Sequence, residues 1–257
     1  MDSRVISIVS GKGGVGKTTL SINLAYALAK HLNKKTLLVD ANITTSHLGV
    51  SLGIRNPPVT LNDLLKTNKK EANFVNLINN LDVLPSAISP LRLKGVDIAK
   101  ISKVIKRLKN GYEFILLDSA PGLGREAISV LKASEEVLFI TNPLTPAALD
   151  IIRVSEICGK LGIVPIGLVL NMVRHKPYEL SAMEIERFTN VPVIAEIPFD
   201  KVVLKSLALR KPFVEIFPNS KPSREVIKLA SIITGEAVPE TRTSWLDKIK
   251  SFFKFFH

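Results

Sequence analysis

A glycine-rich stretch near the start of the chain has the residue types of a phosphate-binding loop. Residues 10–19 read SGKGGVGKTT, in which Gly11, Gly16, Lys17 and Thr18 satisfy the pattern G-x-x-x-x-G-K-[ST]. Glycines at this spacing let backbone N–H groups surround phosphate oxygens without clashes from Cβ atoms. In such a loop the lysine reaches the β- and γ-phosphates of a nucleotide, and the threonine hydroxyl is a ligand of Mg²⁺. We therefore predict a nucleotide–Mg²⁺ site built on this loop.

The loop as a whole is expected to contact the nucleotide, and one of its lysines goes beyond the common pattern. The predicted contact residues in this segment are Gly11, Lys12, Gly13, Gly14, Val15, Gly16, Lys17, Thr18 and Thr19. The partial positive charge at the start of the following helix would add to the attraction for phosphate. The common pattern needs only the cation at Lys17, so Lys12 requires an explanation of its own.

The segments around the loop predict the elements that would position it. Residues 4–10 form a β-branched run, and apolar residues in 18–32 recur at helical spacing. Later apolar runs predict strands at 35–40, 82–86, 113–118, 135–142, 164–171 and 192–198. Amphipathic segments predict helices at 97–111, 146–162 and 221–235. Apolar strands that alternate with amphipathic helices indicate a three-layer α/β fold, in which helices cover both faces of a mostly parallel sheet.

Length and composition limit the organisation of the chain. Its 257 residues, 46% of them hydrophobic, suit one α/β domain, which we place at 1–235 before a polar linker at 236–244. Cys158 is the only cysteine, which excludes disulfide bonds and cysteine-ligated metal clusters within one chain. The first residues lack the apolar core of a signal peptide, so we expect a cytoplasmic protein. The net charge of +12 leaves nucleic acid, anionic lipid and nucleotide open as partners.

The stretch KGGVGKTT resembles the deviant phosphate-binding loop of the MinD/ParA family of ATPases, and the chain is most similar to archaeal MinD-type members. The resemblance covers nearly the whole chain. It implies a P-loop fold that binds ATP or ADP with Mg²⁺ and hydrolyses ATP to ADP and phosphate. In that family two protomers enclose two ATP molecules, and the early lysine of each contacts phosphates held by the other. The resemblance assigns this role to Lys12, where the cation would act as an arginine finger does, and it implies a homodimer in the ATP-bound state.

Other positions match the family pattern one by one. By resemblance, Asp40 is the first switch aspartate near Mg²⁺, and Asp118 is the carboxylate that holds a water on the metal. Gly122, in DSAPGLG, lies where a backbone N–H would meet the γ-phosphate. Asn171 resembles the residue that reads the adenine edge, and Pro198 begins the loop beside that base.

One position departs from the family pattern. MinD relatives carry a second aspartate two residues after the first, whereas this chain reads DAN and has Asn42 there. An amide orients water but accepts no proton at neutral pH, although phosphoryl transfer depends more on positioning than on a strong base. We therefore expect ATP binding and dimerisation with slow turnover, and ordinary turnover is the alternative. The predicted catalytic residues are Lys12, Lys17, Asp40, Asn42 and Asp118.

The final segment, 245–257, reads WLDKIKSFFKFFH and has the pattern of an amphipathic helix. Its aromatic and aliphatic residues fall on one broad face with lysines opposite, as in helices that lie in the plane of lipid headgroups. MinD relatives end in such a membrane-targeting helix, so the resemblance agrees. We predict reversible attachment to the anionic inner face of the cell membrane, strengthened when ATP pairs two tails. Packing on the protein's own core and docking on a partner protein are the alternatives.

A basic stretch at 91–111 leaves DNA open as an alternative partner. Its lysines lie opposite an apolar stripe, which indicates a solvated helix face, but ParA-type relatives bind DNA through surface lysines and arginines. The leading prediction is a membrane-associated ATPase switch that positions an unidentified protein partner. The family resemblance supplies its role, in division-site selection or polar positioning. The alternatives are a DNA-partitioning ATPase similar to ParA and a membrane scaffold that holds ATP almost without hydrolysing it.

Overall fold

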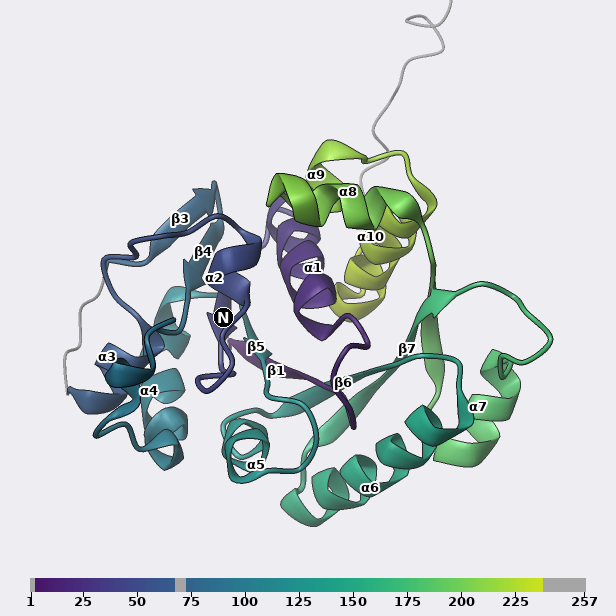
Figure 1. The fold of residues 1–257 in the computed structure, drawn as a ribbon, viewed down its shortest axis with the longest axis horizontal. Coiled ribbons are helices and arrows are strands. Elements are labelled where there is room, and N and C mark those ends of the chain that lie inside the picture. Colours follow the sequence, from purple (N-terminus) through teal and green to yellow (C-terminus); the bar gives the residue numbers. More distant parts are fainter. Residues whose placement is uncertain (1–2, 68–72, 238–257) are drawn as a thin grey trace, which may run out of the picture.

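The centre of the fold is a sheet of eight strands, found within residues 3–67 and 73–237, the part of the chain that the computed structural model describes (Figure 1). The strands lie in the order β3-β4-β2-β5-β1-β6-β7-β8. They are β1 (Arg4–Val9), β2 (Thr36–Asp40), β3 (Val75–Ile78), β4 (Leu81–Leu84), β5 (Phe114–Asp118), β6 (Glu136–Thr141), β7 (Val164–Val173) and β8 (Val193–Pro198). Neighbouring strands are parallel apart from β3, which pairs antiparallel with β4 at one edge.

Helices cover both faces of this sheet. Helices α1, α8, α9 and α10 lie over one face, and α3 to α7 lie over the other (Figure 1). The α-helices are α1 (Lys17–His31), α2 (Leu48–Ser51), α3 (Leu61–Lys66), α4 (Ile101–Leu108), α5 (Arg125–Leu131), α6 (Thr145–Leu161), α7 (Ala182–Thr189), α8 (Lys201–Leu209), α9 (Phe213–Ile216) and α10 (Lys221–Thr234). Short 3-10 turns occur at Pro90–Leu93, Ile98–Lys100 and Lys109–Gly111. The three-layer α/β fold is therefore confirmed.

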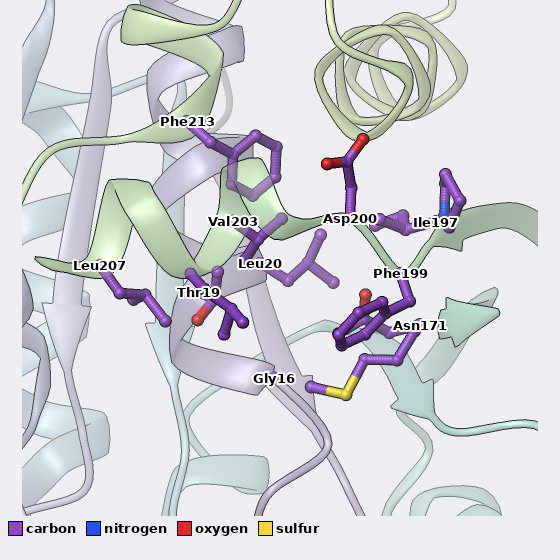
Figure 2. A pocket seen from close by; sticks show the side chains of 13 residues that line it. Gly16, Thr19, Leu20, Asn171, Ile197, Phe199, Asp200, Val203, Leu207 and Phe213 are labelled. Atoms are coloured by element: carbon purple, nitrogen blue, oxygen red, sulfur yellow. The ribbon is translucent and has the colours of Figure 1, made fainter. Parts of the chain in front are cut away.

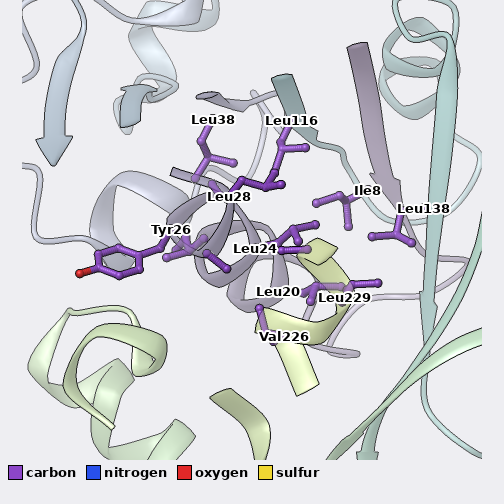
Figure 3. Packing of buried hydrophobic residues seen from close by; sticks show 14 of the residues in the cluster. Ile8, Leu20, Leu24, Tyr26, Leu28, Leu38, Leu116, Leu138, Val226 and Leu229 are labelled. Atoms are coloured by element: carbon purple, nitrogen blue, oxygen red, sulfur yellow. The ribbon is translucent and has the colours of Figure 1, made fainter. Parts of the chain in front are cut away.

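The core has a layer on each face because successive strand residues point to opposite sides of the sheet. In β1, Ile6 and Ile8 belong to the cluster under α1 and α10, whereas Val5 and Val9 belong to clusters on the other face. Figure 3 shows leucines of α1 directed at the strands, with Leu24 toward Ile8. Full burial of one such side chain contributes about 1.5–3 kcal/mol to stability, so this layer holds α1 firmly against the sheet.

The two long helices of the first face end together at the amino edge of the sheet. Lys34, just beyond α1, pairs with Glu236, just beyond α10, with Nζ and Oε1 2.6 Å apart. Arg4, at the start of β1, pairs with Glu136 at 2.7 Å and donates a hydrogen bond to the carbonyl oxygen of Ile233. The described chain therefore ends at the edge of the sheet opposite the phosphate-binding loop.

The strands predicted around the loop are confirmed. The runs expected to end on Asp40 and Asp118 are β2 and β5, which end on these residues. The strand expected at 82–86 is β4, which begins and ends earlier, and the helix expected at 97–111 is α4 between two 3-10 turns. Sequence patterns did not identify β3, α2, α3, α5, α7, α8 or α9.

Two predictions concern residues that the structure does not describe. The linker expected at 236–244 is described only for its first two residues, and the amphipathic helix expected at 245–257 lies wholly outside the described residues. In the described part of the chain, no helix combines the length and the apolar character that crossing a bilayer requires.

Candidate nucleotide-binding site

The phosphate-binding loop joins the carboxyl end of β1 to α1, where the free N–H groups of the helix gather. Helix α1 begins at Lys17 directly after Gly16, which has φ +92° and provides no side-chain cap. Gly14 also adopts a left-handed conformation, with φ +80°. This region favours glycine because it costs other residues about 1–2 kcal/mol. The uncapped first turn of α1 therefore forms an anion site that faces the loop.

The four glycines of the loop have two different roles. A Cβ added at Gly11 would lie 2.0 Å from Cβ of Asp150 in α6, and one added at Gly16 would lie 2.2 Å from Nδ2 of Asn171 in β7. These two glycines allow the loop to pack closely against neighbouring elements. A Cβ added at either of the two glycines between them would meet no atom within 4 Å. That open space lets a ligand approach the backbone.

Two aspartates from neighbouring strands converge behind the loop. Asp40 and Asp118 are register partners at the ends of β2 and β5, and they are 0% and 1% exposed. Asp118 Oδ2 accepts a hydrogen bond from Thr18 Oγ1 at 2.6 Å, and its Oδ1 lies 3.5 Å from Lys17 Nζ. Ser21, one helical turn further along α1, donates a hydrogen bond to the same Oδ1 at 3.1 Å. The structure thus brings Lys17 and Thr18 to Asp118 and adds Ser21, which helical spacing from Lys17 could have indicated.

Asp40 is buried among backbone and hydroxyl donors. Its Oδ2 accepts hydrogen bonds from Ser46 Oγ at 2.6 Å and from the Leu48 N–H at 3.3 Å, and its Oδ1 accepts one from the Asn42 N–H at 3.2 Å. Burial, and next the negative charge of Asp118, raise the pKa of Asp40 from 3.8 to about 7. A cation beside the Asp40 carboxylate would favour its ionised form. The pair is therefore a favourable place for a positive ion.

The oxygen atoms around the loop fit Mg²⁺ as the metal. Thr18, Asp40 and Asp118 offer hydroxyl and carboxylate oxygens, which Mg²⁺ prefers, and Mg²⁺ commonly keeps several waters and binds phosphate oxygens. Within the described residues, no cluster of three or more His, Cys, Asp or Glu could hold a metal ion. Thr18, Asp40 and Asp118 would hold a hard cation that shares its coordination with phosphate groups and water.

The side chain of Asn42 is occupied within its own loop. Its Oδ1 accepts hydrogen bonds from the N–H and the Oγ1 of Thr45, at 3.3 Å and 3.0 Å, and its Nδ2 donates one to the Thr45 carbonyl oxygen at 3.0 Å. Both ends of the amide therefore shape the loop after β2. A carboxylate could not make the donated bond, so Asn42 contributes to this conformation in a way that aspartate would not.

The loop after β5 contacts the phosphate-binding loop. Gly122, with φ +74°, donates its N–H to the carbonyl oxygen of Ser10 at 3.0 Å. The predicted contact of this N–H with a γ-phosphate requires release of the bond to Ser10. The loop is therefore close to the site, in a conformation that does not offer this amide to a ligand.

A largely apolar pocket lies beside the start of α1 (Figure 2). Its lining includes Thr19, Asn171, Pro198, Phe199, Leu207 and Phe213. Asn171 donates a hydrogen bond from Nδ2 to the Val15 carbonyl oxygen at 2.8 Å, and the Arg174 guanidinium lies 3.8 Å from the centre of the Phe199 ring. An apolar pocket with few polar groups beside a phosphate site suits the flat face of a base. The structure thus brings Asn171 and Pro198 together in one pocket beside the phosphate-binding loop.

Lys12 differs from Lys17 in its surroundings. The Lys12 carbonyl oxygen accepts a hydrogen bond from Ser10 Oγ at 2.9 Å, which helps to shape the loop. Within the described residues the Lys12 ammonium has no hydrogen bond or ion pair, whereas Lys17 is 8% exposed and lies beside Asp118. The described part of the chain therefore provides no partner for the Lys12 ammonium.

Sequence patterns missed two residues that contact the end of β2 and the loop after it. Ser86, beyond β4, donates a hydrogen bond to the carbonyl oxygen of Asp40 at 2.7 Å. Glu126, in α5, accepts hydrogen bonds from the backbone of Ile43 and Thr44. Both residues are far from this loop in sequence, and no motif spacing connects them to it.

Comparison with known proteins agrees with this arrangement. A family model described as "ParA: NUBPL iron-transfer P-loop NTPase" matches residues 2–234. The chain is similar to the cell division ATPase MinD of Pyrococcus furiosus, with a TM-score of 0.86 and 36% identity, over 91% of this chain and 99% of that one. It is similar to the septum site-determining protein MinD of Pyrococcus horikoshii complexed with Mg-ADP, with a TM-score of 0.85 and 34% identity, over 90% and 96% of the two chains. A chain of the MinC:MinD cell division protein complex of Aquifex aeolicus matches with a TM-score of 0.80 and 28% identity, over 93% and 99%.

Proposed function

Because the chain belongs to the ParA family of P-loop NTPases, we propose that it is an ATP-dependent switch of MinD type. It binds ATP with Mg²⁺, pairs with a second copy and hydrolyses ATP slowly. While paired, it attaches to the inner face of the cell membrane through 245–257 and positions a protein partner, in division-site selection or at a cell pole. The similarity to the cell division ATPase of Pyrococcus furiosus supports this role.

Different residues of the site would contact the phosphates, the metal ion and the base of a nucleotide. The loop backbone and Lys17 would hold the phosphates. Thr18 would be a direct ligand of Mg²⁺, and Asp40 and Asp118 would hold the metal through water, so that it neutralises phosphate charge. The pocket at Asn171 would take the adenine. The similarity to a MinD complexed with Mg-ADP supports these assignments.

The observation that carries the proposal is the ammonium of Lys12, which has no partner in the described part of its own chain. It belongs to a loop whose open glycines let a ligand approach the backbone. A cation without a partner at such a place would find its counter-charge on the phosphates of a nucleotide. If those phosphates belong to a second copy, nucleotide binding and pairing are coupled through this one side chain.

Substitution of Lys12 tests the switch. We expect Lys12→Ala to bind ADP normally, to remain monomeric with a non-hydrolysable ATP analogue, and to lose about 10²–10³-fold in kcat, as enzymes do when a group that stabilises transition-state charge is removed. Analytical ultracentrifugation and a phosphate-release assay measure these effects. Lys132→Ala, at an exposed lysine after α5, is the matched control and should behave as the parent. Unchanged self-association and turnover in Lys12→Ala would remove the basis of the switch.

Membrane attachment is tested by removing the tail. A single short helix binds a bilayer weakly, since each lysine near an anionic surface contributes about 1 kcal/mol. A dimer with two tails would bind the membrane about 10²–10⁴-fold more tightly than one tail alone. Attachment would therefore depend on whether the nucleotide state allows pairing. Deleting 243–257 should therefore abolish the ATP-dependent sedimentation of the protein with anionic liposomes. Unchanged sedimentation would exclude the tail as the anchor.

A DNA-partitioning ATPase is the second candidate, and the exposed cations around α4 favour it. Lys100, Lys103 and Lys106 are exposed, opposite the buried Ile101 and Ile105. Binding to DNA and to liposomes, measured side by side with ADP and with the ATP analogue, separates the two candidates. ATP-dependent DNA binding that survives deletion of 243–257 would favour partitioning.

Iron transfer, which the name of the matching family mentions, does not follow from the residues of this chain. Iron–sulfur clusters are held by several cysteine thiolates. The sequence contains one cysteine, Cys158, and this residue is buried in the core against the sheet. One chain therefore does not supply the ligands.

A further inference from the structure

A carboxylate outside the predicted site joins the two loops that follow the aspartates. Glu126 lies in the first turn of α5. Its Oε1 accepts hydrogen bonds from the N–H groups of Ile43 and Thr44, the latter at 3.1 Å, and its Oε2 accepts one from Thr44 Oγ1 at 2.9 Å. Glu126 and Ile43 are 83 residues apart in sequence, so the fold, and not local structure, creates this contact.

The contact connects two segments that approach the nucleotide site from different strands. The first switch loop, residues 41–46, follows β2, and the second switch loop, residues 119–124, follows β5 and leads into α5. The second switch loop is also attached to the phosphate-binding loop, through the Gly122 N–H and the Ser10 carbonyl oxygen at 3.0 Å. Glu126 is therefore a link between the first switch loop and the element that the second switch loop continues into.

The first switch loop is held in shape from within, so a displacement at its centre is passed to its neighbours. The side-chain amide of Asn42 accepts two hydrogen bonds from Thr45 and donates one to its carbonyl oxygen. These bonds close the loop around Ile43 and Thr44. Glu126 binds these two enclosed residues. A movement of α5 would therefore carry Asn42 with the rest of the loop.

We propose that Glu126 is a positioning residue that makes the two switch loops move as one unit when a triphosphate occupies the site. Contact between Gly122 and the γ-phosphate breaks the bond to Ser10, and Glu126 passes the resulting movement of the second switch loop to the first. The inference rests on the proposed nucleotide binding and not on hydrolysis. A carboxylate suits this task because its hydrogen bonds with N–H groups are charge-assisted and about twice as strong as neutral ones.

Hydrogen exchange of the nucleotide-free protein tests the contact itself. In Glu126→Ala the amides of Ile43 and Thr44 should exchange at least about tenfold faster, because each loses a hydrogen bond to a charged group. Glu126→Gln should be intermediate, since its Oε1 still accepts from both N–H groups. Glu156→Ala, at an exposed glutamate of α6, is the matched control and should exchange as the parent does. Unchanged exchange at both amides in Glu126→Ala would overturn the proposal.

The coupling is tested by adding Mg²⁺ with adenylyl imidodiphosphate, a non-hydrolysable ATP analogue. In the parent, exchange in segments 41–46 and 119–124 should change together over the same concentration range of the analogue. In Glu126→Ala, segment 119–124 should still respond and segment 41–46 should not. The affinity for ADP should stay within about twofold of the parent, because the hydrogen bonds of Glu126 go to Ile43 and Thr44 and its substitution leaves the phosphate-binding loop untouched.

The outcomes separate this inference from the proposed function. If neither segment of the parent responds to the analogue and no nucleotide binds, the proposed function fails, and this inference fails with it. If both segments respond in Glu126→Ala as they do in the parent, Glu126 does not couple the loops, although the nucleotide function stands. In steady-state assays a positioning role predicts that kcat falls about tenfold with KM within about twofold, and that Glu126→Gln restores most of the loss. A parallel fall in thermal stability with unchanged kcat would show a structural role only and would overturn the proposal.

Discussion

The side chains of the nucleotide site differ in how many partners they already have. Lys17 and Thr18 both contact Asp118, so a nucleotide and its metal would draw them out of an existing network. Lys12 has no such network within the described residues. Asn42 uses both ends of its amide inside the first switch loop. At the scale of residues, ligand binding would therefore require Lys17 and Thr18 to exchange contacts with Asp118 for contacts with the nucleotide and its metal, whereas Lys12 would give up no side-chain contact with a described residue.

Replacing Asn42 with aspartate should raise ATP turnover and lower stability at the same time. A carboxylate can accept a proton from the attacking water, and general-base catalysis contributes about 10²–10⁴-fold where it operates, so we expect kcat to rise at least tenfold. The same carboxylate cannot donate to the Thr45 carbonyl oxygen, now 3.0 Å from Nδ2, and the free energy of unfolding should fall by about 1–3 kcal/mol. An ATPase assay and urea unfolding measure the two effects.

Asn42→Ala is the control for this pair of effects, because it removes the amide without adding a base. It should lose stability and gain no turnover. A folded Asn42→Asp variant that is no faster than the parent would contradict the idea that the amide slows hydrolysis. A parent rate near zero, with turnover appearing only in the aspartate variant, would favour the near-non-hydrolysing scaffold.

At the scale of elements, the ends of strands and helices place these side chains. Parallel strands end at one edge of the sheet, so β2 and β5 deliver Asp40 and Asp118 side by side, and β7 brings Asn171 to the same edge. Helix α1 starts at that edge because β1 runs into the phosphate-binding loop. The close approach of Gly16 to Asn171 joins the phosphate region to the neighbouring pocket.

Gly16→Ala should weaken this junction even without nucleotide. At φ +92° an alanine costs about 1–2 kcal/mol, and its Cβ would displace Asn171 Nδ2, 2.2 Å away, from its hydrogen bond to Val15. We expect the free energy of unfolding of the nucleotide-free protein to fall by about 2–3 kcal/mol, measured by urea unfolding. Gly13→Ala is the matched control, since its Cβ would meet nothing within 4 Å, and it should keep the parent's stability. Equal stability of Gly16→Ala and the parent would contradict the packing described here.

Sequence patterns predicted the parts of the site that depend on a single strand or loop. The positions of Asp40 and Asp118 were recognisable because each ends an apolar run, and the family resemblance supplied their roles. Helices α2 and α9, with four residues each, are too short to show helical periodicity. Glu126 was not recognisable because tertiary packing alone brings it to the first switch loop. Whether the Gly122 N–H is free or bonded to Ser10 is likewise a property of conformation, which no spacing records.

At the scale of the whole molecule, the core beside the sheet keeps a reactive thiol away from solvent. Cys158 of α6 lies fully buried in the cluster formed with β6 and β7. Burial raises the pKa of its thiol to about 11, from 9.0. The thiol therefore remains protonated in the folded protein at pH values where it ionises in the unfolded chain.

The sign of this shift predicts how the thiol contributes to stability as pH changes. The folded state binds the proton more tightly, so the contribution is present below pH 9 and is lost as the pH rises from about 9 toward 11. The stability of the parent relative to Cys158→Ala should therefore decline over that range in urea unfolding. At pH 8 a thiol reagent should modify the native protein far more slowly than the urea-unfolded protein. Rapid modification of native Cys158 would contradict this packing.

The ion pair between Lys34 and Glu236 places the last described residues at the foot of α1. The phosphate-binding loop lies at the head of that helix, and 15 residues of α-helix measure about 22 Å. A nucleotide in the loop is therefore separated by the length of this helix from the point at which the described chain ends. If the proposed pairing holds, a second copy would bring a second tail to the membrane. The effect of the nucleotide beyond residue 237 would then be a larger number of membrane anchors, with no movement transmitted along α1.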